Sequence, residues 1–251
     1  MSEVKIALVT GAASGIGRAS ALALAKAGFT IAVNYRSKKP EAQALLAELP
    51  GDGHRAFGAD VADAGQAGKL VADVLAAYQR LDVLVNAAGQ FTPQDVKSDD
   101  YNEWQDGWQH SLQLNLMAPV NLAFLAAKPM MQQGSGKIIN ITSRGAFRGE
   151  PTAPAYGAAK SGLNSATQSL ALALGGHGIG VYAVAPGWTE TPAASPRIRN
   201  QGWDDVAAQS PLGRIGRPSE IGNLVAFLAG NETDYLTGAI IDANGASYLR
   251  N

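Results

Sequence analysis

The 251-residue chain has no cysteine and only three histidines. The missing cysteines exclude disulfides, thiolate metal ligands and a cysteine nucleophile, although they say little about the cell compartment. The histidines, His54, His110 and His177, do not have the spacing of metal ligands. The sequence therefore predicts no metal site and disfavours a zinc enzyme.

An excess of charge and long apolar runs are missing as well. The formal net charge is −1, which offers no basic surface for nucleic acid and no polybasic segment for a membrane. No stretch reaches the roughly 18 uninterrupted apolar residues of a spanning helix. The N-terminus has neither the basic start nor the long apolar segment of a secretory signal. We therefore expect a cytoplasmic protein that binds neither nucleic acid nor membrane.

The sequence does contain a regular alternation of short apolar runs with longer helical patterns. Ile6–Thr10 is followed by a glycine-rich turn and then by the Ala- and Leu-rich segment Arg18–Ala27, with Gly28 where a helix would end. Six further apolar runs continue the order: Thr30–Asn34, Arg55–Ala59, Asp82–Asn86, Lys137–Thr142, Gly180–Ala185 and Ala239–Asp242. This order predicts an α/β fold with a doubly wound, seven-stranded parallel sheet and helices on both faces.

No repeat or linker divides the chain, so we expect a single domain over residues 1–251. Two stretches lack a regular pattern, Gln90–Asp100 and Trp188–Asp204, and both follow strand ends. Ligands of open α/β sheets bind beyond the carboxyl ends of the strands. Residues 188–204 are therefore expected to form a substrate-binding lid, with an ordinary surface connection as the alternative. The large side chains of this loop are Trp188, Arg197, Arg199 and Trp203.

The turn after the first strand reads Thr-Gly-Ala-Ala-Ser-Gly-Ile-Gly. Glycine lets the backbone turn tightly and approach a pyrophosphate, and the following helix offers free N–H groups and a positive dipole end. Three glycines alone are a weak signal, since glycine also permits close packing. Their place directly after the first strand predicts a dinucleotide site. The residues expected to form it are Gly11, Ala13, Ser14, Gly15, Ile16 and Gly17.

Tyr156 and Lys160 lie four residues apart at the head of a long helical pattern, and therefore on one helical face. A tyrosine with an ordinary pKa of about 10 is a poor acid at neutral pH, and a nearby ammonium lowers that pKa. Ser143 lies thirteen residues before Tyr156 at a strand end, and Asn115 lies in an earlier helical stretch. Taken singly, Ser143 fits a strand-end cap and Asn115 a satisfied helical amide.

Together these motifs resemble the short-chain dehydrogenase/reductase family over nearly the whole chain. The resemblance implies a Rossmann fold and the nicotinamide-dependent interconversion of a carbonyl and an alcohol. It implies that Tyr156 donates and accepts the proton and that Ser143 polarises the substrate carbonyl. It further implies that Lys160 reaches the nicotinamide ribose and that Asn115 holds a helix kink and a water.

Three further motifs match the cofactor site of that family. They are Asn86-Ala87-Ala88-Gly89, the pair Asp60-Val61, and Pro186-Gly187 with Thr189 and Thr191. The resemblance places the first motif beside the sheet and the adenosine, and the second against the adenine ring. It places the third beside the nicotinamide, with Thr191 on its carboxamide.

The end of the second strand bears on the choice between NADP(H) and NAD(H). NAD-selective sites carry an acidic residue there, which accepts from the ribose 2′-OH. This chain has Tyr35, followed by Arg36 and Ser37, and a guanidinium beside neutral side chains favours a 2′-phosphate. Against this, Ser14 stands where some NADP-dependent relatives carry a second basic residue, and Arg36 also fits a solvated helix start. We predict NADP(H) as the preferred cofactor and NAD(H) as the alternative.

Several roles stay open at this point. Arg144, Arg148 and Glu150 either bind an anionic or polar substrate or form a salt-bridged loop. Trp104 and Trp108 are expected to pack against the body of the protein or a partner subunit, and the resemblance implies a dimer or tetramer.

Three other functions compete with a carbonyl reductase. A catalytically silent NADP-binding sensor would be expected to lack Tyr156, Lys160 or Ser143, and all three are present. An NAD-dependent alcohol dehydrogenase on the same fold remains the alternative enzyme. An epimerase would need a longer C-terminal substrate domain. Within the family, the chain is similar to 3-oxoacyl-thioester reductases and glucose-dehydrogenase-like members, and no residue identifies the small-molecule substrate.

Overall fold

The computed structural model describes residues 4–250. Seven parallel strands form one sheet in the order β3-β2-β1-β4-β5-β6-β7. They are β1 (Ile6–Val9), β2 (Thr30–Tyr35), β3 (Arg55–Gly58), β4 (Val83–Asn86), β5 (Gly136–Ile141), β6 (Ile179–Pro186) and β7 (Ile240–Ala243). The predicted α/β fold is confirmed, and each strand lies close to its expected bounds.

The central strands are buried on both faces, which explains why they read as continuous apolar runs. In β1, Ile6 and Leu8 belong to the core on one side of the sheet, whereas Ala7 and Val9 belong to the core on the other. Successive side chains of a strand point to opposite faces, so both layers must be apolar.

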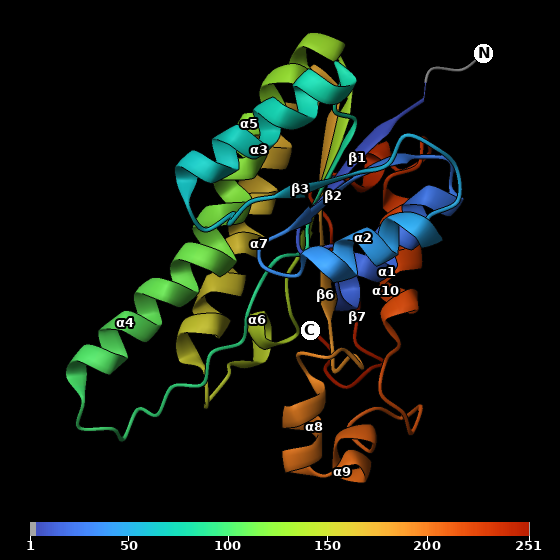
Figure 1. Ribbon diagram of the computed structural model, residues 1–251. Coiled ribbons are helices and arrows are strands. Elements are labelled where there is room, and N and C mark those ends of the chain that lie inside the picture. Colours follow the sequence, from blue (N-terminus) through green and yellow to red (C-terminus); the bar gives the residue numbers. More distant parts are fainter. Residues whose placement is uncertain (1–3, 251) are drawn as a thin grey trace.

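Helices cover both faces of the sheet (Figure 1). One face carries α1 (Gly15–Lys26), α2 (Lys39–Glu48) and α10 (Pro218–Leu228). The other carries α3 (Ala64–Tyr78), α5 (Ala118–Gln133) and α7 (Pro154–Leu174). The helix α4 (Tyr101–Leu112) continues into α5 through a π-helical turn, Gln113–Met117. Short helical segments are α6 (Gly145–Arg148), Gly175–His177 and Asp234–Leu236.

The first helix begins earlier than the sequence suggested, because the glycine turn itself leads into it at Gly15. Its end matches the expectation. Gly28 follows the last helical residues with φ +91°, a conformation that favours glycine.

The region beyond β6 differs from the expectation of an irregular loop over residues 188–204. It contains the helix α8 (Ser195–Gln201) and the start of α9 (Trp203–Ala207), both at the lower end of the molecule in Figure 1. Ile198 and Val206 are buried in a small core that includes Ile215 from farther along the chain. This packing stabilises two short helices in a stretch whose sequence has little helical pattern. Residues 90–100 lack regular structure, as expected.

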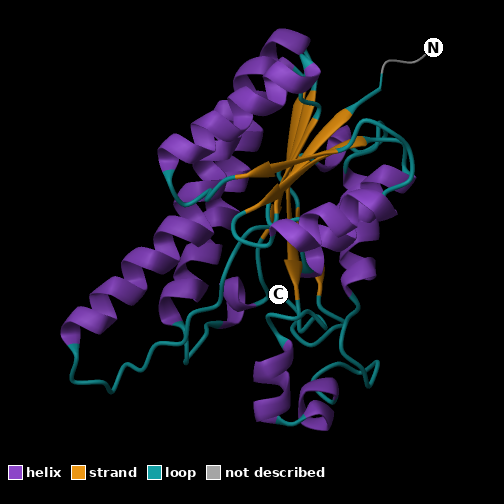
Figure 2. Ribbon diagram, viewed as in Figure 1, coloured by secondary structure: helices purple, strands orange, loops and turns teal. Residues whose placement is uncertain are grey.

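The carboxyl ends of the strands lie at the same end of the molecule as α8 and α9, and the β6 arrow in Figure 2 points toward them. The strand order reverses between β1 and β4, the place where open α/β sheets form a ligand crevice. Within residues 4–250, no helix combines the length and the hydropathy needed to cross a bilayer.

Candidate active site

One cavity of about 970 Å³ follows the carboxyl edge of the sheet. Its volume lies at the upper end of the range for small-molecule sites, roughly 300–1,000 Å³. The glycine turn, the ends of β2, β4, β5 and β6, the head of α7 and the helix α8 all contribute to its wall. All the site residues predicted from the sequence line this cavity except Asn86 and Asn115.

The glycine turn is shaped for close approach of a ligand. Gly11 and Gly15 have φ values of +60° and +57°, which side-chain-bearing residues rarely adopt. A Cβ on Gly17 would lie 2.4 Å from the carbonyl oxygen of Gly11, so the turn and α1 are too close for any side chain. The first turn of α1 has no acidic residue and no side-chain cap. Gly15, Ile16 and Gly17 of this turn line the cavity, so its N–H groups could hold an anion there.

Two basic side chains line the cavity beyond β2. The guanidinium of Arg36 lies 3.8 Å from Asp60 Oδ2, and Lys38 Nζ donates to Ser14 Oγ at 3.5 Å. Lys38 was not among the residues predicted from the sequence. It brings a cation next to Ser14, the position where the sequence lacked a second basic residue. The signal was the basic run from Arg36 to Lys39, of which only Arg36 and Ser37 were predicted to belong to the site.

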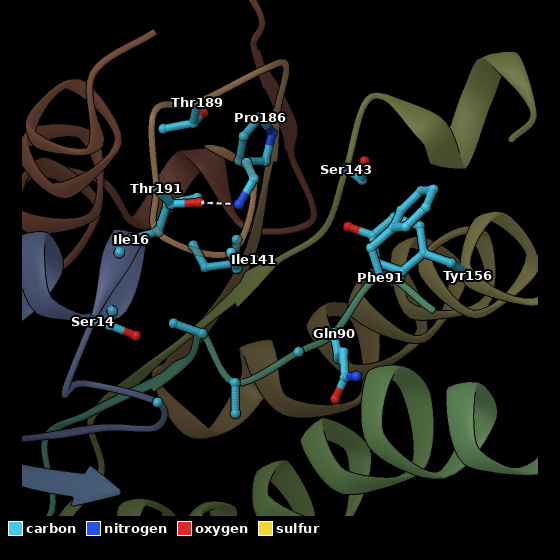
Figure 3. A pocket seen from close by; sticks show the side chains of 18 of the residues that line it. Ser14, Ile16, Gln90, Phe91, Ile141, Ser143, Tyr156, Pro186, Thr189 and Thr191 are labelled. Atoms are coloured by element: carbon cyan, nitrogen blue, oxygen red, sulfur yellow. Dashed lines mark hydrogen bonds between the residues drawn. The ribbon is translucent and has the colours of Figure 1, made fainter. Parts of the chain in front are cut away.

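The candidate catalytic side chains meet on the other side of the cavity. Ser143 lies two residues after the end of β5, and Tyr156 lies in the first turn of α7, one turn before Lys160. The Tyr156 ring packs against Phe91, with 5.2 Å between ring centroids. Figure 3 shows Ser143, Phe91 and Tyr156 on one side, facing Ile16, Thr191 and Pro186. Lys160 Nζ donates to the Ile141 carbonyl at 2.9 Å.

Burial shifts the pKa values of both titratable groups. Burial raises the pKa of Tyr156, and the charge of Glu150 raises it further. A hydrogen bond to Ser143 and the charge of Arg197 lower this pKa. Burial lowers the pKa of Lys160 to about 8. We expected Lys160 to lower the pKa of Tyr156. In the structure the lowering influences are Ser143 and Arg197, because the Lys160 ammonium donates to Ile141 instead.

Asn115 lies in the π-helical turn and supports the wall from behind. Its side-chain amide donates to the Gln90 carbonyl at 2.9 Å, and its oxygen accepts from the Gln90 N–H at 3.1 Å. A Cβ on Gly89 would lie 2.9 Å from Asn115 Oδ1 and 3.4 Å from Lys160 Nζ. Asn115 therefore fixes the backbone after β4 close to Lys160, at the helix irregularity that the family resemblance implied.

Asn86 is also behind the wall. Its side-chain amide donates to Asn140 Oδ1 at 2.9 Å and to the Pro119 carbonyl at 3.2 Å. These bonds join β4 to β5 and to the start of α5. The residue thus stabilises the sheet rather than lining the cavity.

The segment after β6 closes the cavity over the glycine turn. A Cβ on Gly15 would lie 3.2 Å from Thr191 Cγ2, so Thr191 leans directly over the turn. Thr191 Oγ1 accepts from the Ala194 N–H at 3.2 Å, the dashed line in Figure 3. Thr189 Oγ1 donates to the Gly187 carbonyl at 3.2 Å.

Comparison with known proteins agrees with this geometry. Residues 11–245 match a family model described as enoyl-(acyl carrier protein) reductase. The 3-oxoacyl-(acyl-carrier-protein) reductase FabG of Staphylococcus aureus is 38% identical, over 99% of this chain and 100% of the relative. The corresponding reductase of Synechocystis is 36% identical over 98% and 97%, and FabG of Thermotoga maritima is 35% identical over 97% and 97%. The chain belongs to the short-chain dehydrogenase/reductase family. It is an NAD(P)-dependent oxidoreductase, and the resemblance drawn from its motifs is confirmed.

In this short-chain dehydrogenase/reductase, each of the three charged residues after Ser143 (Arg144, Arg148 and Glu150) has a partner. Arg148 and Glu150 form an ion pair at 4.0 Å, so the salt-bridged loop is present. Arg144 is buried and donates to Ser247 Oγ at 2.6 Å and to Gln209 Oε1 at 3.0 Å. Burial, and then the charge of Arg148, lower the pKa of Arg144 to about 10. All three residues also line the cavity.

The wall next to Tyr156 contains an aromatic residue that was not predicted from the sequence, Phe91. Its ring lies between Tyr156 and Arg197, whose guanidinium carbon is 3.7 Å from the ring centroid. The available signal was an aromatic residue directly after the Asn86–Gly89 motif, in a loop already expected to lie near the ligand.

Proposed function

We propose that this enzyme uses NADPH to reduce the carbonyl group of a small-molecule substrate, with Tyr156 as the proton donor. One observation supports the proposal best. The hydroxyls of Ser143 and Tyr156 are hydrogen-bonded to each other on the cavity wall that faces the glycine turn and Thr191. Relatives at 35–38% identity are named 3-oxoacyl-(acyl-carrier-protein) reductases, so 3-oxoacyl thioesters are the first substrates to test.

The chemistry follows from the protonation state of Tyr156. A nicotinamide cofactor, when bound, would supply the hydride that the carbonyl carbon needs. The hydroxyls of Ser143 and Tyr156 bond the carbonyl oxygen, where negative charge develops, and the phenolic proton moves to that oxygen. Because burial raises the pKa of Tyr156, the phenol is protonated at neutral pH, which is the form that reduction needs. Oxidation of the alcohol is the reverse, with the phenolate as base.

The residues present fit NADP(H). The glycine turn fits the pyrophosphate, Asp60 and Val61 fit the adenine side, and Pro186 to Thr191 fit the nicotinamide side. Arg36 and Lys38 supply two cations at the end of β2, where Tyr35 replaces the acidic residue of NAD-selective sites. Lys160 of α7, which also lines the cavity, would hold the nicotinamide ribose.

We further propose that the enzyme is a cytoplasmic homo-oligomer, a dimer or tetramer. Several large apolar side chains are exposed, among them Phe124 (61%), Leu172 (88%) and Phe227 (58%). Contiguous apolar patches, unlike single exposed side chains, mark surfaces that another chain covers, and we propose that these residues belong to such patches. Light scattering on the purified protein measures the oligomeric state directly.

One observation favours a second reaction, the reduction of an enoyl thioester, because the matching family model carries that description. The two hydroxyls would then hold the thioester oxygen instead of the reacting carbonyl.

The test supplies the enzyme with NADPH or NADH and acetoacetyl- or crotonyl-coenzyme A, or with NADP⁺ or NAD⁺ and 3-hydroxybutyryl-coenzyme A. Products are identified by mass spectrometry. We expect NADPH to be consumed with the 3-oxo compound and a 3-hydroxy product to form. Reduction of the crotonyl thioester alone would establish the enoyl reaction instead. Faster oxidation of the 3-hydroxy compound with NAD⁺ would establish the NAD-dependent alcohol dehydrogenase.

A further inference from the structure

Arg197 of α8 lies in an aromatic clamp at the substrate end of the cavity. Its guanidinium carbon is 3.7 Å from the centroid of Phe91 and 5.1 Å from that of Trp188. The two rings come from loops after β4 and β6, and both line the cavity. Cation–π contacts with these two rings hold the charged group in place.

The clamp places the guanidinium beside the proposed reaction centre. Phe91 also packs on the Tyr156 ring, so a single aromatic ring links Arg197 to the proposed proton donor. The Tyr156 ring and the Arg197 guanidinium contact the same Phe91 ring, at 5.2 Å and 3.7 Å from its centroid, and the charge of Arg197 lowers the pKa of Tyr156. One small molecule can therefore contact both.

The hydrogen-bonding capacity of this guanidinium is unused. Within residues 4–250, Arg197 makes no side-chain hydrogen bond and no ion pair, although its side chain is partly buried. The two neighbouring arginines do have polar partners: Arg148 forms an ion pair with Glu150, and Arg144 donates hydrogen bonds to Ser247 and Gln209. A guanidinium has five N–H donors in a planar fork that matches a carboxylate.

The charges of the side chains at this end of the cavity also indicate an anionic ligand. Of the described residues that line it there, Arg144, Arg148 and Arg197 are cationic and Glu150 is anionic. The excess of positive charge favours an anion over a neutral acceptor, because charge-assisted bonds are the stronger ones in a partly desolvated site.

We propose that Arg197 binds a carboxylate of the substrate, so that this enzyme prefers an oxo acid, or the corresponding hydroxy acid, over its neutral ester. The inference rests on the proposed function, because it assigns the carbonyl to Ser143 and Tyr156. It makes Arg197 a specificity residue that holds the end of the substrate that does not react.

The kinetic test compares acetoacetate with its methyl ester, which removes the charge and keeps the carbonyl. We expect the wild-type enzyme to favour the acid, and Arg197→Met to raise the KM for the acid about tenfold or more. The KM for the ester should change less than about threefold. Arg197→Lys should be intermediate, since it keeps the charge and loses the fork.

Arg199→Met is the matched control, because Arg199 lies on the same helix and is exposed outside the cavity lining. It should leave both KM values unchanged. Equal kcat/KM for acid and ester in the wild type would overturn the proposal. So would an identical effect of Arg197→Met on the two substrates.

A binding measurement separates this inference from the proposed function. Acetoacetate is titrated into wild type, Arg197→Met and Arg199→Met, with and without NADP⁺, and followed by tryptophan fluorescence, for which Trp188 beside Arg197 is the reporter. Weaker binding in Arg197→Met alone supports the inference even if no carbonyl compound consumes NADPH, the result that overturns the proposed function. Equal binding in all three proteins overturns the inference and leaves a working reductase intact.

Discussion

Lys160 is buried as an ammonium with one carbonyl partner, and this has a consequence for folding. Burial lowers its pKa from 10.5 to about 8, whereas the unfolded chain keeps the ordinary value. Between about pH 8 and 10.5 the unfolded state therefore binds more protons, and the stability of the folded state rises with pH in that window. At neutral pH the buried charge lowers the free energy of unfolding.

We predict that Lys160→Met stabilises the cofactor-free protein at pH 7 by about 1–3 kcal/mol, after allowing for the lost bond to Ile141. The gain should shrink at pH 10, where the wild-type lysine is largely neutral. Urea unfolding of both proteins at the two pH values measures the difference. A gain that stays constant between pH 7 and pH 10 would contradict the account.

Arg36 and Lys38 are the residues on which the choice of cofactor depends. We predict that Arg36→Met and Lys38→Met each weaken NADPH binding about three- to tenfold, a modest factor because Arg36 is half exposed, and leave NADH binding nearly unchanged. Lys39→Met is the control, since Lys39 is exposed and does not line the cavity. Equal losses for NADPH and NADH would show that these side chains do not recognise the 2′-phosphate.

At the scale of elements, α3 ends in a conformation that its sequence does not favour. Gln79 is the C-cap and has φ +62°, in the left-handed region, whereas Gly134 occupies the same conformation after α5. We predict that Gln79→Gly raises the free energy of unfolding by about 1 kcal/mol, because glycine adopts this backbone without strain. Gln79→Ala keeps the strain and should bring no gain. Urea unfolding measures both variants, and a gain in the alanine variant would locate the effect in the side chain instead.

The elements differ in how far the sequence predicted them. The strands were predictable because β1 and β4 are buried on both faces and read as unbroken apolar runs. The helix α8 was not, since Ile198 is its one buried residue and belongs to a small core with Ile215, which forms only in the folded chain. Lys38 was missed because only the folded loop shows that it reaches Ser14.

At the scale of the molecule, the parallel sheet gathers the site from segments far apart in the sequence. Because every strand ends at the same edge, the residues after each strand were predictable as neighbours, and nearly all of them line one cavity. The contact of Phe91 with Arg197 and the raised pKa of Tyr156 were not predictable, because they depend on loop packing and burial rather than on spacing.

The most direct test of the account is one comparison of wild type with Tyr156→Phe, which removes a single oxygen from the wall of the cavity. In each protein the dissociation constant for NADPH and the turnover of NADPH with acetoacetyl-coenzyme A are measured. Tyr101→Phe, at an exposed position outside the cavity lining, is the control.

We predict that Tyr156→Phe binds NADPH within about threefold of wild type and turns over about 100- to 10,000-fold more slowly, as expected for the loss of a general acid. The control should match the wild type. Turnover by Tyr156→Phe within tenfold of the wild type, with NADPH bound normally, would show that Tyr156 is not the proton donor.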